Sequence, residues 1–482
     1  MTTPDHVDVL IIGAGLSGIG AAAQLAQSRP QTSYAVLERR AASGGTWDLF
    51  RYPGIRSDSD MYTLGYRFRP WRGEKALADG ASILDYVRDT AREYGVDRRI
   101  RYGHHVIGAD WDSAAARWTV TTMVDGVERQ LTSDFLWACS GYYDYDEGFT
   151  PDFEGRERFQ GQVVHPQHWS EDLPYAGKKV VVIGSGATAV TLVPALANSG
   201  AEHVTMLQRS PTYVLSLPAR DGFATRTRTV LGPKASYAVT RWKNIAVSTA
   251  LFQLSRRRPR SIRGFIRKEN IKLLPEGYDV DTHFRPTYDP WDQRLCLVPD
   301  GDLFRVISDG SASVVTDRIR TFTETGLELE SGETLDADII ITATGLNVRI
   351  FGGAALSVDG VEREPGTTTA YRAMMLSGVP NFAFTIGYTN ASWTLKADLV
   401  AEYVCRLLDH MDATGARSVV PIRDESVGEV PLMDFQAGYI QRVVDTLPRQ
   451  GTRAPWALKQ NYFYDARLLR RAPMDDGVLS YG

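Results

Sequence analysis

Two glycine-rich turns, each between a predicted strand and a predicted helix, constrain the fold of this 482-residue chain more than any other feature. The first turn, Gly13-Ala14-Gly15-Leu16-Ser17-Gly18, follows a Val- and Ile-rich strand predicted over 6–12. A helix is expected over 19–27 and a second strand over 33–37. Glycines let such a turn approach a pyrophosphate closely, and the helix N-terminus offers free N–H groups to it. The segment therefore predicts a βαβ unit that binds a dinucleotide.

The second turn repeats this architecture in the middle of the chain. It reads Gly184-Ser185-Gly186-Ala187-Thr188-Ala189, with alanine in place of the third glycine, which the pattern permits. A strand is predicted before it over 180–183, a helix after it over 190–198, and a further strand over 203–207. The predicted fold class is therefore α/β, with two dinucleotide-binding, Rossmann-like domains.

The residue 20 positions past each turn distinguishes the two sites. Glu38 lies 20 residues past Gly18, and its carboxylate suits ribose hydroxyls but repels a 2′-phosphate, so the first site suits FAD or NAD. Arg209 lies 20 residues past Ala189, where a guanidinium favours a 2′-phosphate, and Ser210 can add a hydrogen bond. The second site therefore suits NADPH. Opposite preferences imply hydride transfer from NADPH to a bound flavin, FAD.

Composition excludes several other classes of function. The net charge of −4 gives no reason to expect nucleic acid as a partner. Three widely spaced cysteines, Cys139, Cys296 and Cys405, form no Cys-x-x-Cys pair, so neither a redox disulfide nor a metal site is predicted. Oxygen is then the natural electron acceptor. Acidic Asp5 and Asp8 precede the apolar run 9–26, unlike a secretory signal, and we expect a cytoplasmic protein.

The segment between the two turns carries a family fingerprint. It runs Phe159-Gln160-Gly161-Gln162-Val163-Val164-His165-Pro166-Gln167-His168-Trp169 and resembles Phe-x-Gly-x3-His-x3-Trp of the Baeyer–Villiger monooxygenases, which are class B flavin monooxygenases. That motif usually closes with Pro or Asp, whereas Ser170 closes it here. In this family the histidine is thought to couple domain motion to catalysis, a role close to that of a structural histidine.

Two further motifs extend the resemblance over most of the chain. Gly44-Gly45-Thr46-Trp47, then Tyr52-Pro53-Gly54, then Asp58 matches the family pattern Gly-Gly-x-Trp-x4-Tyr-Pro-Gly-x3-Asp, and Ala343-Thr344-Gly345 resembles its return segment. The resemblance implies that Trp47, Tyr52 and Pro53 form a wall beside the flavin ring. Core packing is the alternative for Tyr52 and Pro53.

The resemblance implies an FAD- and NADPH-dependent monooxygenase that uses O2. Its C4a-peroxyflavin attacks small hydrophobic ketones as an anion, giving esters or lactones, and oxidises sulfur in thioethers and thioamides when protonated. One alternative is an N- or S-oxygenating flavin monooxygenase without ketone activity, against which Trp169 argues. The other is a non-catalytic protein that senses NADPH.

By the same resemblance, Arg294 and Asp58 are the catalytic candidates. Arginine keeps its positive charge and can stabilise an anionic oxygen species, and Asp58 would orient it; a plain ion pair is the structural alternative. Many relatives have lysine immediately before this arginine to help bind the 2′-phosphate, but Gln293 occupies that position. Arg209 would then carry NADPH recognition alone.

The remaining candidates complete the predicted cofactor sites. Trp393 is a candidate for nicotinamide or substrate contact, with an aromatic at a domain interface as the alternative. The cofactor-contact candidates are every member of the two turns except Leu16, together with Glu38, Gly45, Thr46, Trp47, Asp58, Val106, Arg209, Ser210 and Trp393.

The predicted division gives residues 1–145 and 379–482 to the FAD-binding domain, and 146–219 and 291–378 to the NADPH-binding domain. A helical insertion in the second domain spans 220–290. Between residues 220 and 272, fourteen Lys or Arg side chains face only two acidic ones, a local net charge of +12. A solvated helical face explains this charge, and weak peripheral contact with an anionic membrane is the sharper hypothesis.

Overall fold

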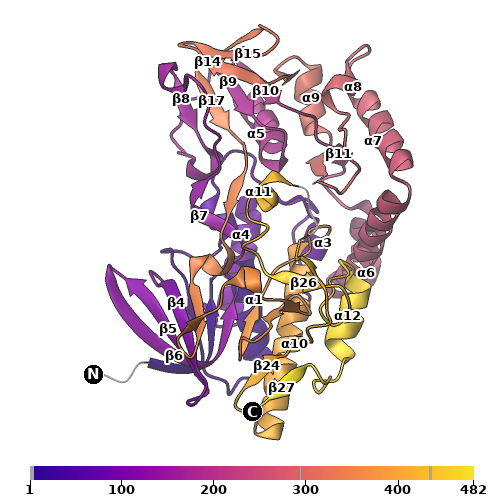
Figure 1. Ribbon diagram of the computed structural model, residues 1–482. Coiled ribbons are helices and arrows are strands. Elements are labelled where there is room, and N and C mark those ends of the chain that lie inside the picture. The colour runs from indigo at the N-terminus through magenta and orange to yellow at the C-terminus, as the bar shows by residue number, and fades with distance from the viewer. Residues whose placement is uncertain (1–4, 294, 434–436) are drawn as a thin grey trace.

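The computed structural model describes residues 5–293, 295–433 and 437–482, arranged around two β-sheets (Figure 1). Strand β1, Asp5–Ile12, pairs in parallel with β2, Tyr34–Leu37, and with β6, Val127–Ala138. The sheet order is β20-β19-β4-β5-β6-β1-β2-β3, and β23 also pairs with β6. The remaining strands of this sheet are β3 Ile100–Arg101, β4 His105–Asp112, β5 Arg117–Val124, β19 Ala355–Val358, β20 Val361–Glu362 and β23 Phe382–Phe384. Strand β2 and the second half of β1 are apolar because they are buried on both faces, against the helices on one side and against residues of β4, β19 and β23 on the other.

Helices α1, Leu16–Ser28, and α10, Trp393–Thr414, pack together beside this first sheet, and α4, Gly80–Glu93, packs on α1. Gly20 allows one close contact, because a Cβ there would lie 2.6 Å from the ring of Tyr66. The predicted first βαβ unit is confirmed, although α1 begins a few residues earlier than expected.

The second sheet is fully parallel, in the order β13-β10-β9-β17-β8. Its strands are β8 Gln162–Val164, β9 Lys179–Ile183, β10 His203–Gln208, β13 Ala312–Thr316 and β17 Ile339–Thr342. Helices α5, Ala187–Asn198, and α9, Asp302–Ser308, pack on each other and bury one apolar cluster with this sheet. The second predicted βαβ unit is therefore confirmed.

The chain crosses between the two sheets at two neighbouring places. Strand β7, Tyr143–Gly148, leaves the first sheet, and β18, Leu346–Val348, returns from the second; the two strands pair antiparallel. Strands β19 and β20 then join the first sheet next to β4. The predicted boundary at residue 378 therefore lies too late, because the chain re-enters the first sheet by Ala355.

Three helices occupy the segment predicted as an insertion: α6 Gly222–Arg257, α7 Pro259–Leu273 and α8 Val280–His283. Helix α6 bends at Gly232, whose φ of 72° breaks the helical conformation, and it runs along one edge of the molecule in Figure 1. There it packs on α3, Met61–Leu64, and touches α12, Tyr462–Arg471, through Trp242. The insertion thus contacts the first domain as well as the second.

Short elements complete the fold. They are α2 Thr46–Leu49, α11 Gly438–Gln441, β11 Val214–Leu217, β12 Cys296–Pro299, β14 Ile319–Phe322, β15 Gly326–Leu329, β16 Thr334–Asp336, β21 Ala370–Tyr371, β22 Met375–Leu376, β24 Val419–Pro421, β25 Glu429–Pro431, β26 Arg449–Gly451 and β27 Leu479–Tyr481. Among the helices of the described residues, none is both long and apolar enough to cross a bilayer.

Candidate active site between two dinucleotide folds

The first glycine turn lies against the end of strand β6. Gly13 has a φ of +99°, and a Cβ there would lie 2.9 Å from the carbonyl oxygen of Cys139. Gly18 faces the same restriction, because a Cβ would overlap the carbonyl of Gly13. The backbone of Gly15 also passes close to Gly45, whose Cβ would lie 2.9 Å from the Gly15 Cα. The turn can pack this closely against its neighbours only because these positions are glycine.

Glu38 directly follows strand β2 and lies beside this turn. One of its carboxylate oxygens accepts from the backbone N–H of Ala14 at 2.8 Å, and the other from that of Arg40 at 2.9 Å. Burial raises the pKa of Glu38, while the two backbone hydrogen bonds oppose that rise. The carboxylate is therefore held against the first turn by two backbone hydrogen bonds.

The second turn has the same geometry with different neighbours. Gly184, with a φ of +136°, lies so close to the carbonyl of Ala343 that a Cβ would clash. Ser185 Oγ contacts the carbonyl of Ser210 at 3.2 Å and the hydroxyl of Thr212 at 2.7 Å. Arg209 is exposed, and its guanidinium has no ion pair within the described part of the chain. A cation thus stands beside the second turn where Glu38 stands beside the first.

Both folds open onto one cavity of about 370 Å³. From the predicted set it is lined by Gly13, Gly15, Ser17, Glu38, Gly45, Thr46, Trp47, Asp58, Val106, Ala187, Thr188 and Trp393. The others, namely Ala14, Gly18, Gly184, Ser185, Gly186, Ala189, Arg209 and Ser210, lie in or beside the turns but do not line it. The first turn and the start of helix α5 therefore face a common space.

The two catalytic candidates differ in what the structure describes. Asp58 lines the cavity, with Arg56, Ser57 and Ser59 beside it in the same loop. Arg294 lies outside the described residues, so its pairing with Asp58 stays a prediction. Gln293, the residue before it, is half-buried.

Aromatic side chains form part of the cavity wall. Trp393 opens helix α10 and donates from Nε1 to the hydroxyl of Ser17 at 2.6 Å, while its ring lies 5.4 Å from that of Tyr142. Tyr52 is buried and bonds to the side chain of Thr188 in helix α5, and burial raises the pKa of Tyr52 to about 12. Tyr52 therefore lines the cavity and also packs in the core of the second domain, so the wall and the core-packing interpretations both apply to it.

Sequence reasoning missed the segment after strand β6. Residues 140–145 line the cavity, and the hydroxyl of Tyr145 lies 3.3 Å from that of Thr46; burial raises the pKa of Tyr145 to about 12. A usable signal existed, since residues that follow parallel strands gather at the carboxyl edge of a sheet, where ligands bind. Arg349 and Phe351, which line the cavity after the chain returns, gave no such signal.

His165 of the fingerprint lies at the crossing between the sheets. Its ring packs against Gly148 in β7, where a Cβ would clash with it. Nδ1 accepts from the N–H of Gln167 at 3.2 Å, so the proton resides on Nε2, which donates to the carbonyl of Gly345 at 3.2 Å. Burial lowers the pKa of His165, which favours this neutral form. The residue thus ties the two crossing strands together.

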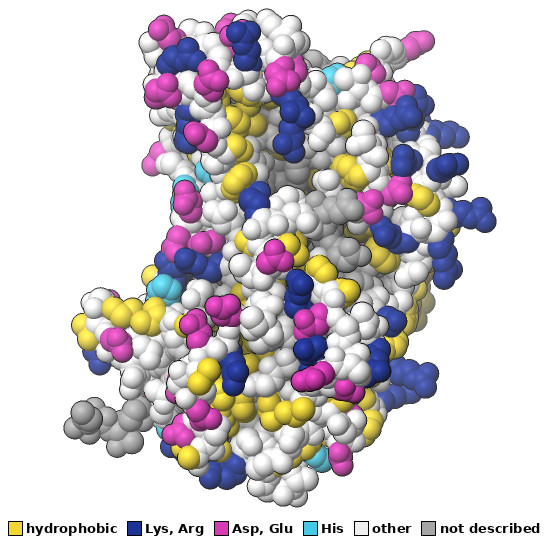
Figure 2. Space-filling view, in the orientation of Figure 1, with side chains coloured by type: hydrophobic (Ala, Val, Ile, Leu, Met, Phe, Trp, Pro, Cys, Tyr) yellow, Lys and Arg dark blue, Asp and Glu magenta, His cyan; other side chains and the backbone are white. Residues whose placement is uncertain are grey.

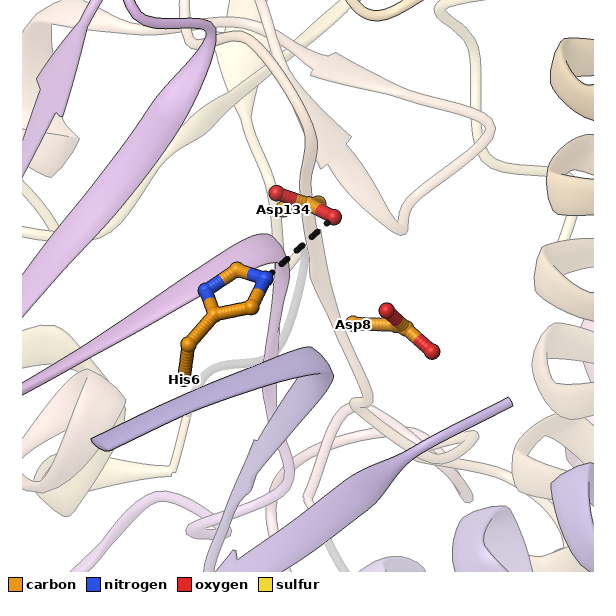
Figure 3. Close-up of side chains that lie close together, drawn as sticks. All are labelled: His6, Asp8 and Asp134. Carbon is orange, nitrogen blue, oxygen red and sulfur yellow. Dashed lines mark ion pairs between the residues drawn. The ribbon is translucent and has the colours of Figure 1, made fainter. Parts of the chain in front are cut away.

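A separate group of possible metal ligands lies at the opposite end of β1 (Figure 3). His6 Nε2 lies 3.6 Å from an Asp134 oxygen, and Asp8 accepts from the backbone N–H of Ser33 at 2.7 Å. His6 also contacts the hydroxyl of Thr132 at 3.0 Å. Surface ion pairing and strand-end hydrogen bonds account for these three side chains.

Two dinucleotide-type turns that face a common cavity define a two-domain oxidoreductase of the flavoprotein type. Residues 76–352 match the family model described as flavin-binding monooxygenase-like, and residues 11–72 match an NAD(P)-binding Rossmann-like domain. The chain belongs to the flavin-binding monooxygenase-like family.

Similar proteins agree with this assignment. The chain is 58% identical over 478 residues to the FAD-containing monooxygenase EthA of Mycobacterium tuberculosis, covering 99% of this chain and 98% of EthA. It is 48% identical over 480 residues to the probable FAD-binding monooxygenase AlmA of Acinetobacter baylyi, covering 99% and 96%. The predicted class of FAD-containing monooxygenase is confirmed.

Solved structures share the fold at low sequence identity. An oxidised steroid monooxygenase bound to NADP aligns with a TM-score of 0.78 at 22% identity, over 99% of both chains. A cyclohexanone monooxygenase from Rhodococcus sp. Phi1 bound to NADP+ aligns with a TM-score of 0.72 at 20% identity, over 87% of both chains. The predicted architecture of two Rossmann-like domains is confirmed.

Proposed function

We propose that this chain holds FAD at the first turn and NADPH at the second, and transfers one atom of O2 to a small hydrophobic ketone or organosulfur compound. The observation that carries this proposal is the common cavity, which the first turn, Asp58 and the start of helix α5 all line. Hydride transfer requires two dinucleotides to meet, and this cavity is where both folds open.

Residues of the two turns have distinct roles in this proposal. The first turn and Glu38 would hold FAD, whose ribose accords with a fixed carboxylate. The second turn, Arg209 and Ser210 would hold NADPH, whose 2′-phosphate accords with an exposed guanidinium lacking an ion pair in the described residues. The bound flavin, once reduced by NADPH, would be the group that reacts with O2.

The chain's own residues would then control the fate of that oxygen. Arg294 remains charged at any working pH and would stabilise developing negative charge in the cavity, and Asp58 would orient it. The aromatic wall that includes Trp393 and Tyr142 would exclude water and accept an apolar substrate. Together these roles favour insertion of oxygen beside a ketone carbonyl, or transfer to sulfur.

Product analysis by mass spectrometry tests this function. Purified yellow protein would be incubated with NADPH, O2 and a panel of ketones, thioethers and thioamides, with NADPH omitted as the control. We expect esters or lactones from ketones, sulfoxides from thioethers, or both. Sulfur products alone would favour the N- or S-oxygenating alternative, and NADPH binding with no product from any compound would favour the sensor.

A further inference from the structure

Between residues 235 and 254 the outward face of helix α6 is mostly apolar, contrary to what a surface helix in water requires; Lys243, the cation on that side, is partly buried and paired with Asp221 at 2.7 Å. Every exposed residue from 235 to 254 is apolar, and these residues recur at helical spacing. We name this set the α6 stripe; its members are Ala235, Ala238, Val239, Trp242, Ala246, Val247, Ala250 and Leu254. Val239, Trp242, Val247 and Leu254 are 43%, 49%, 59% and 49% exposed. The inward face instead holds polar side chains such as Thr240 and Arg241.

Aromatic residues of helix α12 widen the stripe at its middle. The ring of Trp242 stacks on that of Phe463 at 6.1 Å and meets Tyr462 edge-on at 5.9 Å. Phe463 and Tyr464 are themselves 44% and 37% exposed. Twenty residues of helix span about 30 Å, so the stripe is a long apolar strip and not a single hydrophobic side chain.

Cations stand at both ends of the α6 stripe. Lys234 precedes it, and Arg257, Arg258 and Arg260 follow it; none of the four has an ion pair within the described residues. Figure 2 shows Lys and Arg side chains gathered along the edge where Figure 1 places α6 and α7. No acidic side chain of the described residues pairs with these four cations, although the neighbouring Arg256 pairs with Asp292.

We propose that the α6 stripe docks on an anionic lipid bilayer, with helix α6 lying in the plane of the membrane surface. Apolar side chains would enter the boundary between headgroups and acyl chains, and the terminal cations would reach lipid phosphates. Trp242, with its polar N–H, belongs to the residue types that prefer this boundary. No spanning helix is required.

The charges at the two ends of the α6 stripe argue against a second copy of this chain as the partner that covers it. Packed antiparallel, two α6 helices would place Lys234 of one copy beside Arg257 and Arg258 of the other, so cations would face cations. Packed in parallel, identical cations would meet at each end. An anionic surface instead complements both ends at once.

Flotation of the FAD-loaded, full-length protein with lipid vesicles tests the proposal. One set of vesicles contains phosphatidylcholine alone and the other about 30% phosphatidylglycerol. We expect binding to the anionic vesicles at about 0.1 M salt, at least about tenfold weaker binding to phosphatidylcholine, and weakening at about 0.5 M salt because screening reduces the attraction.

Paired variants separate the apolar and charged contributions. Val239→Glu with Leu254→Glu places charges in the stripe and should reduce binding at least about tenfold. Arg257→Glu with Arg258→Glu should reduce binding to anionic vesicles about fivefold or more per charge. Neither pair touches the cofactor turns, so NADPH oxidation should remain, which also shows that the variants fold.

A matched control comes from the hairpin of β5 and β6, far along the chain from the insertion. Val127 is 55% exposed and Arg129 is exposed in the same strand. Val127→Glu with Arg129→Glu makes the same kinds of change and should bind vesicles like the unaltered protein.

Three results would overturn the proposal. The first is no binding to anionic vesicles at about 0.1 M salt. The second is binding that survives Val239→Glu with Leu254→Glu. The third is a dimer in sedimentation equilibrium that this pair dissociates, which would assign the stripe to self-association. These outcomes do not depend on which compound the enzyme oxygenates.

Discussion

Replacing Arg241 by methionine tests how the helical insertion is held against the first domain. Arg241, on the inward face of α6, donates to a carboxylate oxygen of Asp398 in α10 at 3.0 Å. Its guanidinium also donates to the carbonyls of Tyr62 at 2.8 Å and Gly65 at 2.6 Å. The two paired side chains are only 6% and 7% exposed. One arginine thus joins three segments of the protein.

The structure sets the size of the expected loss. Methionine retains an unbranched apolar stem but none of the hydrogen-bond donors, so the Asp398 carboxylate and the carbonyls of Tyr62, Thr63 and Gly65 lose a buried partner. Removing one partner of a buried ion pair costs about 3–5 kcal/mol, because the remaining charge is left in an apolar environment. We therefore expect Arg241→Met to lower the free energy of opening the insertion by about that amount at pH 8.

The loss should depend on pH, because Asp398 can escape the penalty by taking up a proton. Burial raises the pKa of Asp398 to about 6, although Arg241 and the N–H of Arg67 oppose the rise. Because the pKa of Asp398 is higher in the folded state than in the unfolded state, where it is about 3.9, the free energy of unfolding falls as the pH rises between these two pKa values. The fall is about 1.4 kcal/mol per pH unit.

In the unaltered protein this fall ends near pH 6. Without Arg241 the pKa of Asp398 rises further, so the fall continues above pH 6. The loss of stability caused by Arg241→Met should therefore stay constant below pH 6 and grow above pH 6. If the pKa of Asp398 in the variant rises by about two units, this growth amounts to about 3 kcal/mol at pH 8.

Hydrogen exchange of the α6 amides measures this opening directly. A loss of 3 kcal/mol accelerates exchange by a factor of about 150 once intrinsic rates are corrected for pH. Arg241→Met combined with Asp398→Asn is the control, since an amide cannot titrate and the growth above pH 6 should disappear. Equal losses at pH 5 and pH 8, or growth that persists in the double variant, would refute the reasoning.

Further predictions concern the cofactor sites. Arg209→Ala should raise the KM for NADPH far more than it changes turnover with NADH, and equal effects in steady-state kinetics would remove Arg209 from 2′-phosphate recognition. Arg294→Ala should still reduce FAD with NADPH yet form little oxygenated product, and a normal product yield would exclude it from the mechanism. Gly13→Ala should lower the flavin absorbance per protein because a Cβ would clash with the carbonyl of Cys139, whereas Gly126→Ala, at a φ of +76° but in open space, should retain flavin.

The two dinucleotide folds could be predicted because each depends on local sequence. A turn such as residues 13–18 requires glycine at fixed positions, and the residue that ends the next strand, Glu38 or Arg209, follows at a fixed spacing. In the structure each of these residues directly follows its strand, and Glu38 is hydrogen bonded to the turn itself. Because nearby residues set where these strands begin and end, the bounds of β1 and β10 lie within one residue of the predicted ones.

Features that depend on contacts distant in the chain escaped prediction. The return into the first sheet near Ala355 depends on pairing between β19 and β4, about 250 residues apart, which no local pattern encodes. Likewise, the composition of the insertion showed its charge but not its orientation. Helix α6 turns Arg241 inward because Asp398 is there to pair with it, and this leaves Trp242 and Leu254 facing outward. The orientation of α6 thus depends on contacts with distant segments such as Asp398, which the composition of the insertion does not show.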